Sequence, residues 1–309
     1  MDWHVNNEAL PTLQFSPAAA LVLQGILALV IFGVALELSF ADFRRLLSQP
    51  KPVFAALFSQ LLVLPLLTFG LIWVLDPSPG LALGLMMTAA CPGGNMSNLL
   101  THWSGGRTSV SMSATTISSL ISPITTPLTF ALLGGLHPAT QAALQEIRVP
   151  ALELVMTIAV ALMLPLLAGM TLASKKPELA KRLLMPLRRF GLIVFFGFVV
   201  VALAANGRLF LHVISTLFVL VLLHNLLAMV SGYGVGALFR VSEGERRAIT
   251  FETGIHNTAL GLTLVFSYFP TQTNMILVLG WWGVWQLGTG GVLAWLWARR
   301  RPAASSVYR

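Results

Sequence analysis

The sequence predicts an all-α polytopic membrane protein with about nine transmembrane helices. Of its 309 residues, 56% are apolar and only 10% are charged, and uncharged apolar stretches recur along the chain. A helix needs about 20 apolar residues to cross the hydrocarbon core of a bilayer, and these stretches have that length. The composition excludes an ordinary soluble globular protein. We therefore expect a single transmembrane domain over residues 1–309.

Nine spans follow from apolar length and from the turn and charge signals between the apolar stretches. They are expected at 17–40, 53–75, 80–102, 108–134, 149–173, 190–206, 209–239, 248–268 and 273–298. The sixth span is short and the seventh is long, so their boundary at Gly207 and Arg208 is the least defined. No Lys or Arg precedes the first span, whereas a secretory signal peptide begins with a basic region. We therefore expect the first span to remain in the mature protein.

Basic residues are concentrated in alternate loops, which predicts the orientation of the chain. One side carries Arg44, Arg45, Lys51, Arg107, Lys175, Lys176, Lys181, Arg182, Arg188, Arg189, Arg240, Arg246, Arg247, Arg299, Arg300, Arg301 and Arg309. Only Arg148 and Arg208 fall on the other side. Because cytoplasmic loops carry the excess of Lys and Arg, we expect the N-terminus outside and the C-terminus in the cytoplasm. The net charge of +8 then reflects loops that face anionic membrane lipid, and no nucleic-acid partner is implied.

Two polar clusters interrupt the third and eighth spans, CPGGNMSN at 91–98 and FETGIHN at 251–257. Pro92 lacks a backbone N–H and the two glycines after it loosen the chain, so we expect the helix to break there. Gly254 can break the eighth span. Proline and glycine also kink and pack membrane helices. Here the two spans run in opposite directions, as in inverted repeats, so paired breaks predict one site built from two discontinuous helices.

Glu252 lies within an apolar span that contains no basic partner. A carboxylate at that depth needs a cation, hydrogen-bond donors or a proton. Any single Ser or Thr in a membrane helix can instead bond the carbonyl four residues before it, so only a set of oxygens is informative. The nearby set suits a hard cation, which prefers oxygen ligands. Its members are Ser97, Asn98, Ser111 and Thr115.

Several motifs, in order, resemble those of the bile acid:sodium symporter family. The run CPGGNMSNLLTHWSGGRTSVSMSATTISSLISPITTPL is similar to the family signature, and FETGIHNTALGLTL to its second crossing-helix motif. LVLLHN at 220–225 and ADFRRLL at 41–47 are similar to two further motifs. The resemblance covers about residues 21–297. Bacterial members often have ten helices, and the resemblance implies that the nine spans expected here correspond to all but the first of them.

The resemblance implies a two-part architecture and alternating access. A panel domain would comprise about 17–40 and 149–206. A core domain of six spans would comprise about 53–134 and 209–298, and the two discontinuous helices would cross in it. The protein would reside in the plasma membrane, which in a bacterium is the inner membrane.

The same resemblance, carried over residue by residue, implies two sodium sites. The first would be formed by Ser97, Asn98, Ser111, Thr115 and Glu252. The second would be formed by Gln60, Glu252, Thr253, Ile255 and His256, through the backbone at Thr253 and Ile255. The family usually has Gln where His256 stands, and one imidazole nitrogen matches sodium less well than an amide oxygen. An imidazole can also change charge between about pH 5 and 8, so the hypothesis is coupling to one sodium ion, with or without a proton.

The substrate is expected where the N-termini of the two half-helices converge, near Asn95, Met96 and Asn257. Positive helix ends favour an anion. The resemblance therefore implies sodium symport of a small or amphipathic organic carboxylate, such as a bile acid or a pantoate-like or pyruvate-like acid. No cofactor is expected beyond sodium as the coupling ion.

Two alternatives remain open from the residues. Cys91, the one cysteine, excludes an internal disulfide, and it lies beside the first break, as a thiol would in an arsenite exporter of related fold. Glu252 and His256 form an ExxxH pair that would share a face of an unbroken helix, as in an intramembrane enzyme. No nucleophile or third metal ligand accompanies that pair. We expect transport and not catalysis.

Overall fold

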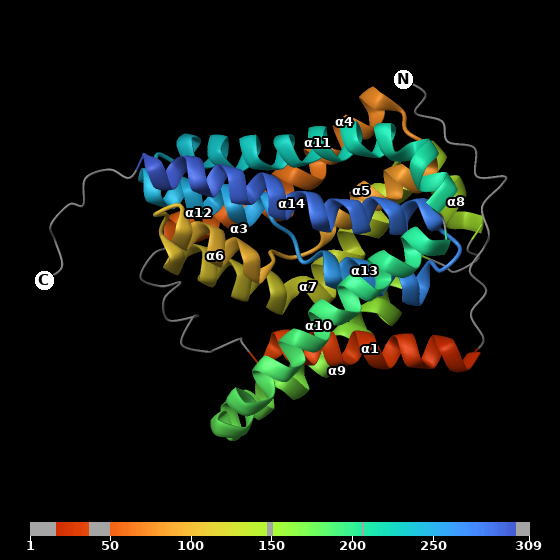
Figure 1. Cartoon of the computed structure of the whole chain (residues 1–309), viewed down its shortest axis with the longest axis horizontal. Coiled ribbons are helices and arrows are strands. Elements are labelled where there is room, and N and C mark those ends of the chain that lie inside the picture. The colour runs from red at the N-terminus through yellow and green to blue at the C-terminus, as the bar shows by residue number, and fades with distance from the viewer. Residues whose placement is uncertain (1–16, 37–49, 147–150, 206, 301–309) are drawn as a thin grey trace, which may run out of the picture.

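The computed structural model describes residues 17–36, 50–146, 151–205 and 207–300, and within these ranges the chain forms helices and no strands (Figure 1). The elements are α1 (Pro17–Ala35), α3 (Pro50–Phe58), the π-helical turn η2 (Ser59–Val63), α4 (Leu64–Leu75), α5 (Pro79–Ala90), α6 (Asn95–Trp103), α7 (Thr108–Leu136), α8 (Pro138–Glu146), α9 (Ala151–Lys175), α10 (Pro177–Ala205), α11 (Gly207–Leu238), α12 (Glu243–Gly254), α13 (Thr258–Tyr268) and α14 (Thr273–Arg299).

Five helical stretches in the described part of the chain are long and apolar enough to cross a membrane. By length and composition they are Pro50–Leu75, Thr108–Leu136, Val155–Lys175, Ile214–Leu238 and Thr273–Arg299. Shorter apolar helices cover Val22–Ala35, Pro79–Ala90 and Thr258–Tyr268. Together with the absence of described strands, these spans confirm the predicted class of an all-α, multi-pass membrane protein.

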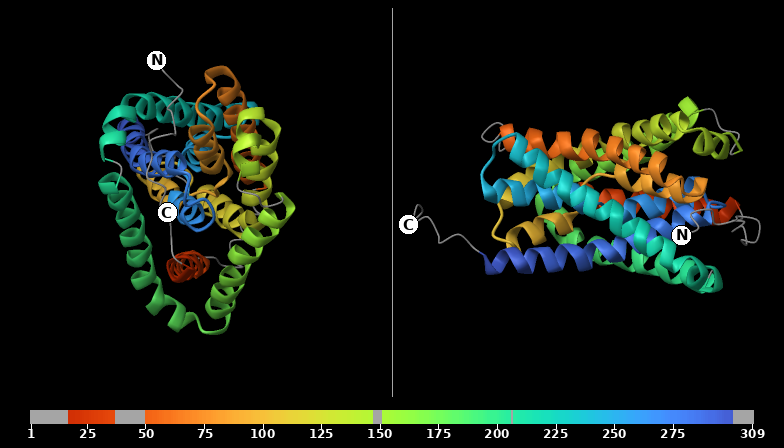
Figure 2. Two further views of the ribbon diagram at one scale, coloured as in Figure 1. Left: turned by 90° about the vertical axis from the view of Figure 1, so that its right-hand side faces the viewer. Right: turned by 90° about the horizontal axis from the view of Figure 1, so that it is seen from above.

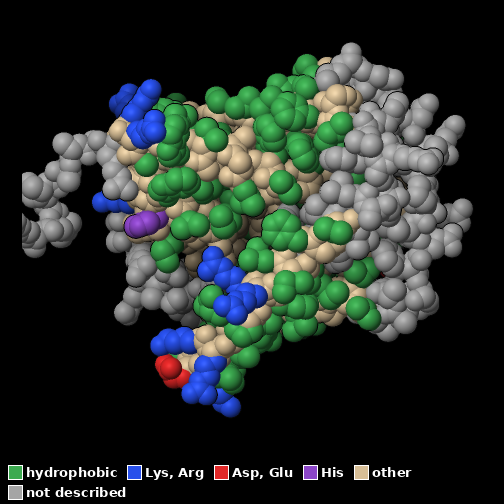
Figure 3. Space-filling view, in the orientation of Figure 1, with side chains coloured by type: hydrophobic (Ala, Val, Ile, Leu, Met, Phe, Trp, Pro, Cys, Tyr) green, Lys and Arg blue, Asp and Glu red, His purple; other side chains and the backbone are tan. Residues whose placement is uncertain are grey.

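Outward-facing apolar side chains agree with that class. Along α9, Leu152, Met156, Val160 and Leu164 recur every four residues, and each is more than half exposed. Side chains four apart lie on the same face of a helix, so α9 presents one continuous apolar stripe. Apolar side chains cover much of the face seen in Figure 3. Such a surface is suited to lipid and would be a liability in water.

The two predicted helix breaks are present. The third span consists of α5 and α6, which are separated at 91–94, and the eighth consists of α12 and α13, which are separated at 255–257. Both breaks lie at the Pro-Gly-Gly and Gly-containing segments, where the chain loses backbone donors or gains conformational freedom. The half-helices α6 and α13 therefore both begin inside the molecule (Figure 1).

The helix that contains the predicted sixth span is longer than that span. We expected the span at 190–206, and α10 begins at Pro177, continues through Pro186 and ends at Ala205. Proline is tolerated in the first turn of a helix, and the Leu-, Lys- and Arg-rich segment that follows has high helix propensity. The helix therefore starts before the apolar stretch from which the span was predicted. As a result, the basic residues at 181, 182, 188 and 189 lie on a helix and not in the expected loop.

Other differences are smaller. The short helix α8 was not predicted, and α12 begins at Glu243, before the expected 248. Several expectations lie outside the described residues. They concern the two termini, the motif at 41–47 and the basic residues Arg44, Arg45, Arg148, Arg301 and Arg309.

Helices α1, α9 and α10 lie together on one side of the molecule. In the left view of Figure 2, α9 and α10 form the two arms of a V, and α1 lies between them. Packing contacts join α1 to both arms, and they also join α1 to α13 and α10 to α14. The side formed by α1, α9 and α10 therefore packs against the part of the molecule that contains the broken helices. The remaining helices form a larger bundle around the breaks.

The outer ends of α6 and α12 are held together by charged side chains. Arg247 Nη1 donates to Ser104 O at 2.6 Å, and Arg107 forms an ion pair with Glu245 at 2.6 Å. Glu245 also completes a capping box with Ser242 at the start of α12. Burial opposes ionisation of Glu245, but hydrogen bonds from Ser242 and Arg107 outweigh it and lower its pKa. These contacts join the C-terminal end of α6 and the turn after it to the first turns of α12.

Candidate functional site

The two breaks cross by direct backbone pairing. The Gly94 N–H donates to Ile255 O at 3.0 Å, and the Asn257 N–H donates to Pro92 O at 2.9 Å. This pairing forms a short antiparallel β-bridge between the two segments. Within a membrane, backbone groups freed from a helix must find partners inside the protein. The crossing supplies several of those partners and leaves the N-termini of α6 and α13 side by side.

The first break requires glycine because the second comes so close. A Cβ at Gly94 would lie 2.9 Å from His256 O, and a Cβ at Gly93 would overlap Glu252 Oε1. The same Cβ at Gly93 would lie 3.3 Å from Gln60 Nε2. Gly93 thus leaves room for two polar side chains from different helices. The PGG sequence serves this close approach as well as breaking the helix.

Buried polar side chains from other helices complete the backbone bonding at the breaks. Gln286 on α14 accepts from the His256 N–H at 2.8 Å and donates to His256 O at 3.1 Å. Asn225 on α11 donates to Gly254 O at 3.1 Å, and Thr126 on α7 donates to Ala90 O at 2.9 Å. We did not predict these roles for Gln286 and Thr126. The available signal was an amide in the apolar span of α14.

The Glu252 carboxylate is the centre of a buried oxygen cluster. Its side chain is 0% exposed. Oε2 accepts from Ser97 at 2.7 Å, Thr115 at 2.9 Å and Ser111 at 3.2 Å. Thr115 Oγ1 also lies 3.3 Å from Asn98 Oδ1. The structure thus brings together all five residues predicted for the first sodium site, although their role as ligands stays a prediction.

The cluster around Glu252 is rich in oxygen acceptors. Each hydroxyl carries one hydrogen, whereas Thr115 Oγ1 alone faces Glu252 Oε2, Asn98 Oδ1 and Ser111 O. Oxygen lone pairs therefore outnumber the protons that could bridge them. None of the ion pairs between described residues involves Glu252. The cluster has the oxygen chemistry of an alkali or alkaline-earth ion, and no cluster of three His, Cys, Asp or Glu is found in the described part.

Residues of the second predicted site also lie around the crossing. The buried Gln60 belongs to the π-helical turn η2, and its two amide atoms have no hydrogen-bond partner among the described residues. The same holds for Glu252 Oε1 and His256 Nε2. Two of these atoms, Gln60 Nε2 and Glu252 Oε1, lie near the position that a Cβ at Gly93 would take, so both are at the first break. Their fit to sodium stays a prediction.

His256 is oriented by its neighbours. Its Nδ1 lies 3.2 Å from Cys91 O, to which the tautomer with its hydrogen on Nδ1 donates. In that neutral tautomer Nε2 presents a lone pair. The ring packs edge-on against Trp282, with centroids 5.2 Å apart. Trp282 Nε1 in turn donates to His224 Nδ1 at 2.9 Å. A histidine held in this way can meet a cation or a proton at Nε2.

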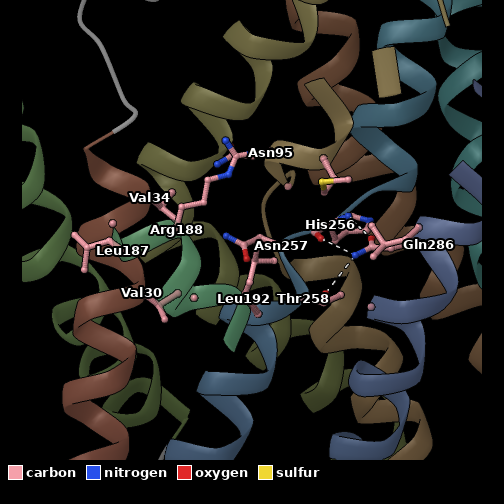
Figure 4. A pocket seen from close by; sticks show the side chains of 17 residues that line it. Val30, Val34, Asn95, Leu187, Arg188, Leu192, His256, Asn257, Thr258 and Gln286 are labelled. Carbon is pink, nitrogen blue, oxygen red and sulfur yellow. Dashed lines mark hydrogen bonds between the residues drawn. The ribbon is translucent and has the colours of Figure 1, made fainter. Parts of the chain in front are cut away.

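A pocket of about 200 Å³ opens beside the crossing, between the α1, α9 and α10 side and the broken helices. All three residues predicted to bind substrate line it: Asn95, Met96 and Asn257. Figure 4 shows Asn257 near the centre of the view and Asn95 above it. The start of α6 and the start of α13 therefore face one space, as the sequence predicted. Binding of a substrate there stays a prediction.

Asn257 has two functions in this arrangement. Its Oδ1 accepts from the Leu260 N–H at 3.2 Å and so caps the N-terminus of α13. Its Nδ2 remains a potential donor to the pocket. Helix N-termini attract negative charge, and two of them converge here. The site is therefore suited to an anion on one side and to cations on the other.

Residues 25–213 match the model of the sodium bile acid symporter family. The chain belongs to this family. Its members are transporters and not enzymes, so the alternative of an intramembrane enzyme is excluded. Cys91, which suggested an arsenite exporter, is buried. Its thiol packs closely against Gly261, where an added Cβ would lie 3.0 Å from the Sγ atom.

Sodium bile acid symporter relatives align along most of this chain. It is 28% identical over 277 residues to the "Uncharacterized sodium-dependent transporter YocS" of Bacillus subtilis (strain 168), covering 89% of this chain and 82% of that protein. It is 30% identical over 283 residues to the "Probable sodium/metabolite cotransporter BASS1, chloroplastic" of Arabidopsis thaliana, covering 89% of this chain and 66% of that protein. It is 28% identical over 269 residues to the human ileal sodium/bile acid cotransporter, covering 82% and 72%.

Proposed function

We propose that this protein is a secondary active transporter that moves a small or amphipathic organic anion together with sodium. The carrying observation is the buried Glu252 carboxylate, which is surrounded by hydroxyl and amide oxygens and has no basic partner in the described part. An uncompensated charge at membrane depth costs several kcal/mol. A sodium ion in the cluster would offset that cost. The sodium-related names of three relatives support the proposal.

Coupling between sodium and substrate follows from shared backbone. Ser97 and Asn98 belong to the first turn of α6, directly after the pocket residues Asn95 and Met96. On the second break, His256 is adjacent to the pocket residue Asn257. A cation that draws the oxygens of these segments together would also hold Asn95 and Asn257 in place. Sodium would thereby raise substrate affinity, and the substrate would raise sodium affinity by the same factor.

Alternating access supplies the transport step of the proposal. The side formed by α1, α9 and α10 would be the panel, and the bundle that contains both breaks would be the core. The pocket lies between them, so a relative movement would expose it to either side of the membrane. We place the protein in the plasma membrane, the inner membrane of a bacterium, with the N-terminus outside and the C-terminus in the cytoplasm. Basic residues at the ends of α9, α10 and α14 support that orientation.

Reconstitution tests the proposal directly. Purified protein in liposomes should accumulate at least one organic acid from a screen when an inward sodium gradient is imposed. Replacing sodium by potassium or choline should abolish accumulation, and dissipating the gradient should convert accumulation into exchange. Sodium should also stabilise the detergent-solubilised protein against heating. Uptake and stability that are both indifferent to sodium would refute sodium symport.

Substitution of Asn257 tests the substrate side of the site. Asn257→Asp keeps the helix cap but replaces a pocket donor by a negative charge, so affinity for an anionic substrate should fall about tenfold to a hundredfold. Asn257→Leu should lower the substrate affinity by a similar factor. It should also lower the stability by about 1 kcal/mol, because the helix cap is lost. Asn95→Leu should weaken binding without loss of a cap. Binding isotherms with an acid identified in the screen measure these effects. Unchanged affinity in all three variants would place the substrate elsewhere.

His256 determines the proposed stoichiometry of one sodium ion, with or without a proton. Wild-type uptake should show a Hill coefficient for sodium of about one and should vary with pH, whereas His256→Gln should raise the coefficient and flatten the pH profile. The substitution is conservative, because Gln286 binds the backbone of residue 256 and not its ring. The titratable side chain that lies beyond Trp282 from the ring is His224. Two-sodium cooperativity in the wild type, together with indifference to pH, would contradict this stoichiometry.

A further inference from the structure

Arg188 lies on the pocket, although its sequence position suggested a cytoplasmic loop. It belongs to α10, which begins earlier than predicted, and it is among the residues that line the pocket. In Figure 4 its side chain extends from α10 across the pocket toward Asn95. Figure 3 shows Lys and Arg side chains beside the hollow between the bundle and the α1, α9 and α10 side. A guanidinium group therefore faces the proposed substrate site from the opposite wall.

No described residue neutralises this charge. The ion pairs of the described part join Arg107 to Glu245, Lys181 to Glu178, and Arg247 to Glu243. Arg188 takes part in none of them, and no Asp or Glu lines the pocket. The other electrostatic features of the lining are the N-termini of α6 and α13, which are also positive. Three positive groups around one space favour an anion strongly.

The remaining lining sets the size and polarity of that anion. Val30 and Val34 come from α1, Leu187 and Leu192 from α10, and Leu287 from α14. The pocket volume of about 200 Å³ is below the roughly 300–1,000 Å³ typical of sites for drug-sized ligands. This volume favours a short organic acid with a branched or linear apolar tail over a rigid amphipathic molecule of steroid size.

We propose that Arg188 binds the carboxylate of a small monocarboxylate whose apolar tail packs against α1 and α10, and that this contact selects small acids over bile acids. This inference rests on the transport function proposed above and names its substrate class. Arginine presents a planar pair of donors that matches a carboxylate. Because Arg188 is on the α1, α9 and α10 side and Asn257 is at the crossing, the anion would connect both walls of the pocket.

Binding measurements on the full-length protein in detergent, with sodium present, test this inference. The probes are isovalerate, hexanoate and ketoisocaproate, with isovaleramide as the neutral match of isovalerate and cholate as the large carboxylate. At least one small acid should bind and isovaleramide should not. Arg188→Gln should lower the binding affinity for that acid about tenfold to a hundredfold, which is the range for loss of a hydrogen bond to a charged group. Arg188→Lys should have an intermediate affinity, because it keeps the charge and loses the paired donors.

Arg189→Gln is the matched control, because Arg189 is the next residue on α10, is also exposed and does not line the pocket. It should bind the acid as the wild type does. Equal losses at the two positions would show a general surface-charge effect and overturn the inference. So would cholate binding without any small acid, unchanged affinity in Arg188→Gln, or wild-type protein that binds none of the three acids.

The sodium response separates this inference from the function on which it rests. Arg188 is not among the oxygens around Glu252, so Arg188→Gln should retain the full thermal stabilisation by sodium. Sodium stabilisation of the wild type without binding of any small acid would overturn only the substrate assignment. Absence of both would also reject the proposed function.

Discussion

Glu252→Gln should abolish the stabilisation of this protein by sodium and its sodium-driven uptake. Gln has nearly the same volume and keeps hydrogen-bond partners for Ser97 and Thr115, but it removes the only carboxylate of the cluster. At a sodium concentration a hundred times its Kd, the wild type should gain about 2.7 kcal/mol of stability, and the variant should gain almost none. Thermal unfolding in sodium and in potassium measures the difference.

The same experiment without sodium gives a second, opposite expectation. The variant should then be at least as stable as the wild type, because it no longer buries an uncompensated charge. Glu243→Gln is a suitable control: this carboxylate lies at the start of the same helix and pairs with Arg247, away from the crossing. Its sodium response should match that of the wild type. A Glu252→Gln variant that keeps the full sodium response would place the cation site elsewhere.

Gly93→Ala should also have a large effect, because the first break has no room for a methyl group. The added Cβ would overlap Glu252 Oε1 and crowd Gln60 Nε2, so the carboxylate or the break must move. Overpacking of this kind costs about 1–3 kcal/mol, and displacement of Glu252 should remove the sodium response in addition. Thermal unfolding with and without sodium, together with uptake, measures both parts.

Two further glycines make the test specific. Gly94→Ala should destabilise through a contact with His256 O, whereas Gly70→Ala on α4 has nothing within 4 Å and should be neutral or slightly stabilising. A Gly93→Ala variant that behaved like Gly70→Ala would show that the crossing is looser than described. If Gly94→Ala loses stability but keeps its sodium response, then close packing at the β-bridge contributes to stability independently of the position of Glu252.

Local sequence determined the features that depend on local chemistry. Pro92 and its two glycines cannot continue a helix, and Glu252 cannot remain in an apolar span without partners, so both breaks and the oxygen cluster were predicted. Apolar length located most helices to within a few residues. The structure brings together Ser97, Ser111, Thr115 and Glu252 as expected.

Tertiary structure decided which distant side chains complete the site. Gln286 bonds to both backbone groups of residue 256 across 30 positions of sequence, and Asn225 reaches Gly254 across 29. Nothing local to either break identifies these partners, because they depend on how α11 and α14 pack. Arg188 shows the same limit: a hydropathy boundary assigned it to a loop, whereas the extended α10 carries it to the pocket wall. Helix breaks follow from the backbone chemistry of a few adjacent residues, but the groups that satisfy them and the charge that faces them are set by packing between remote helices.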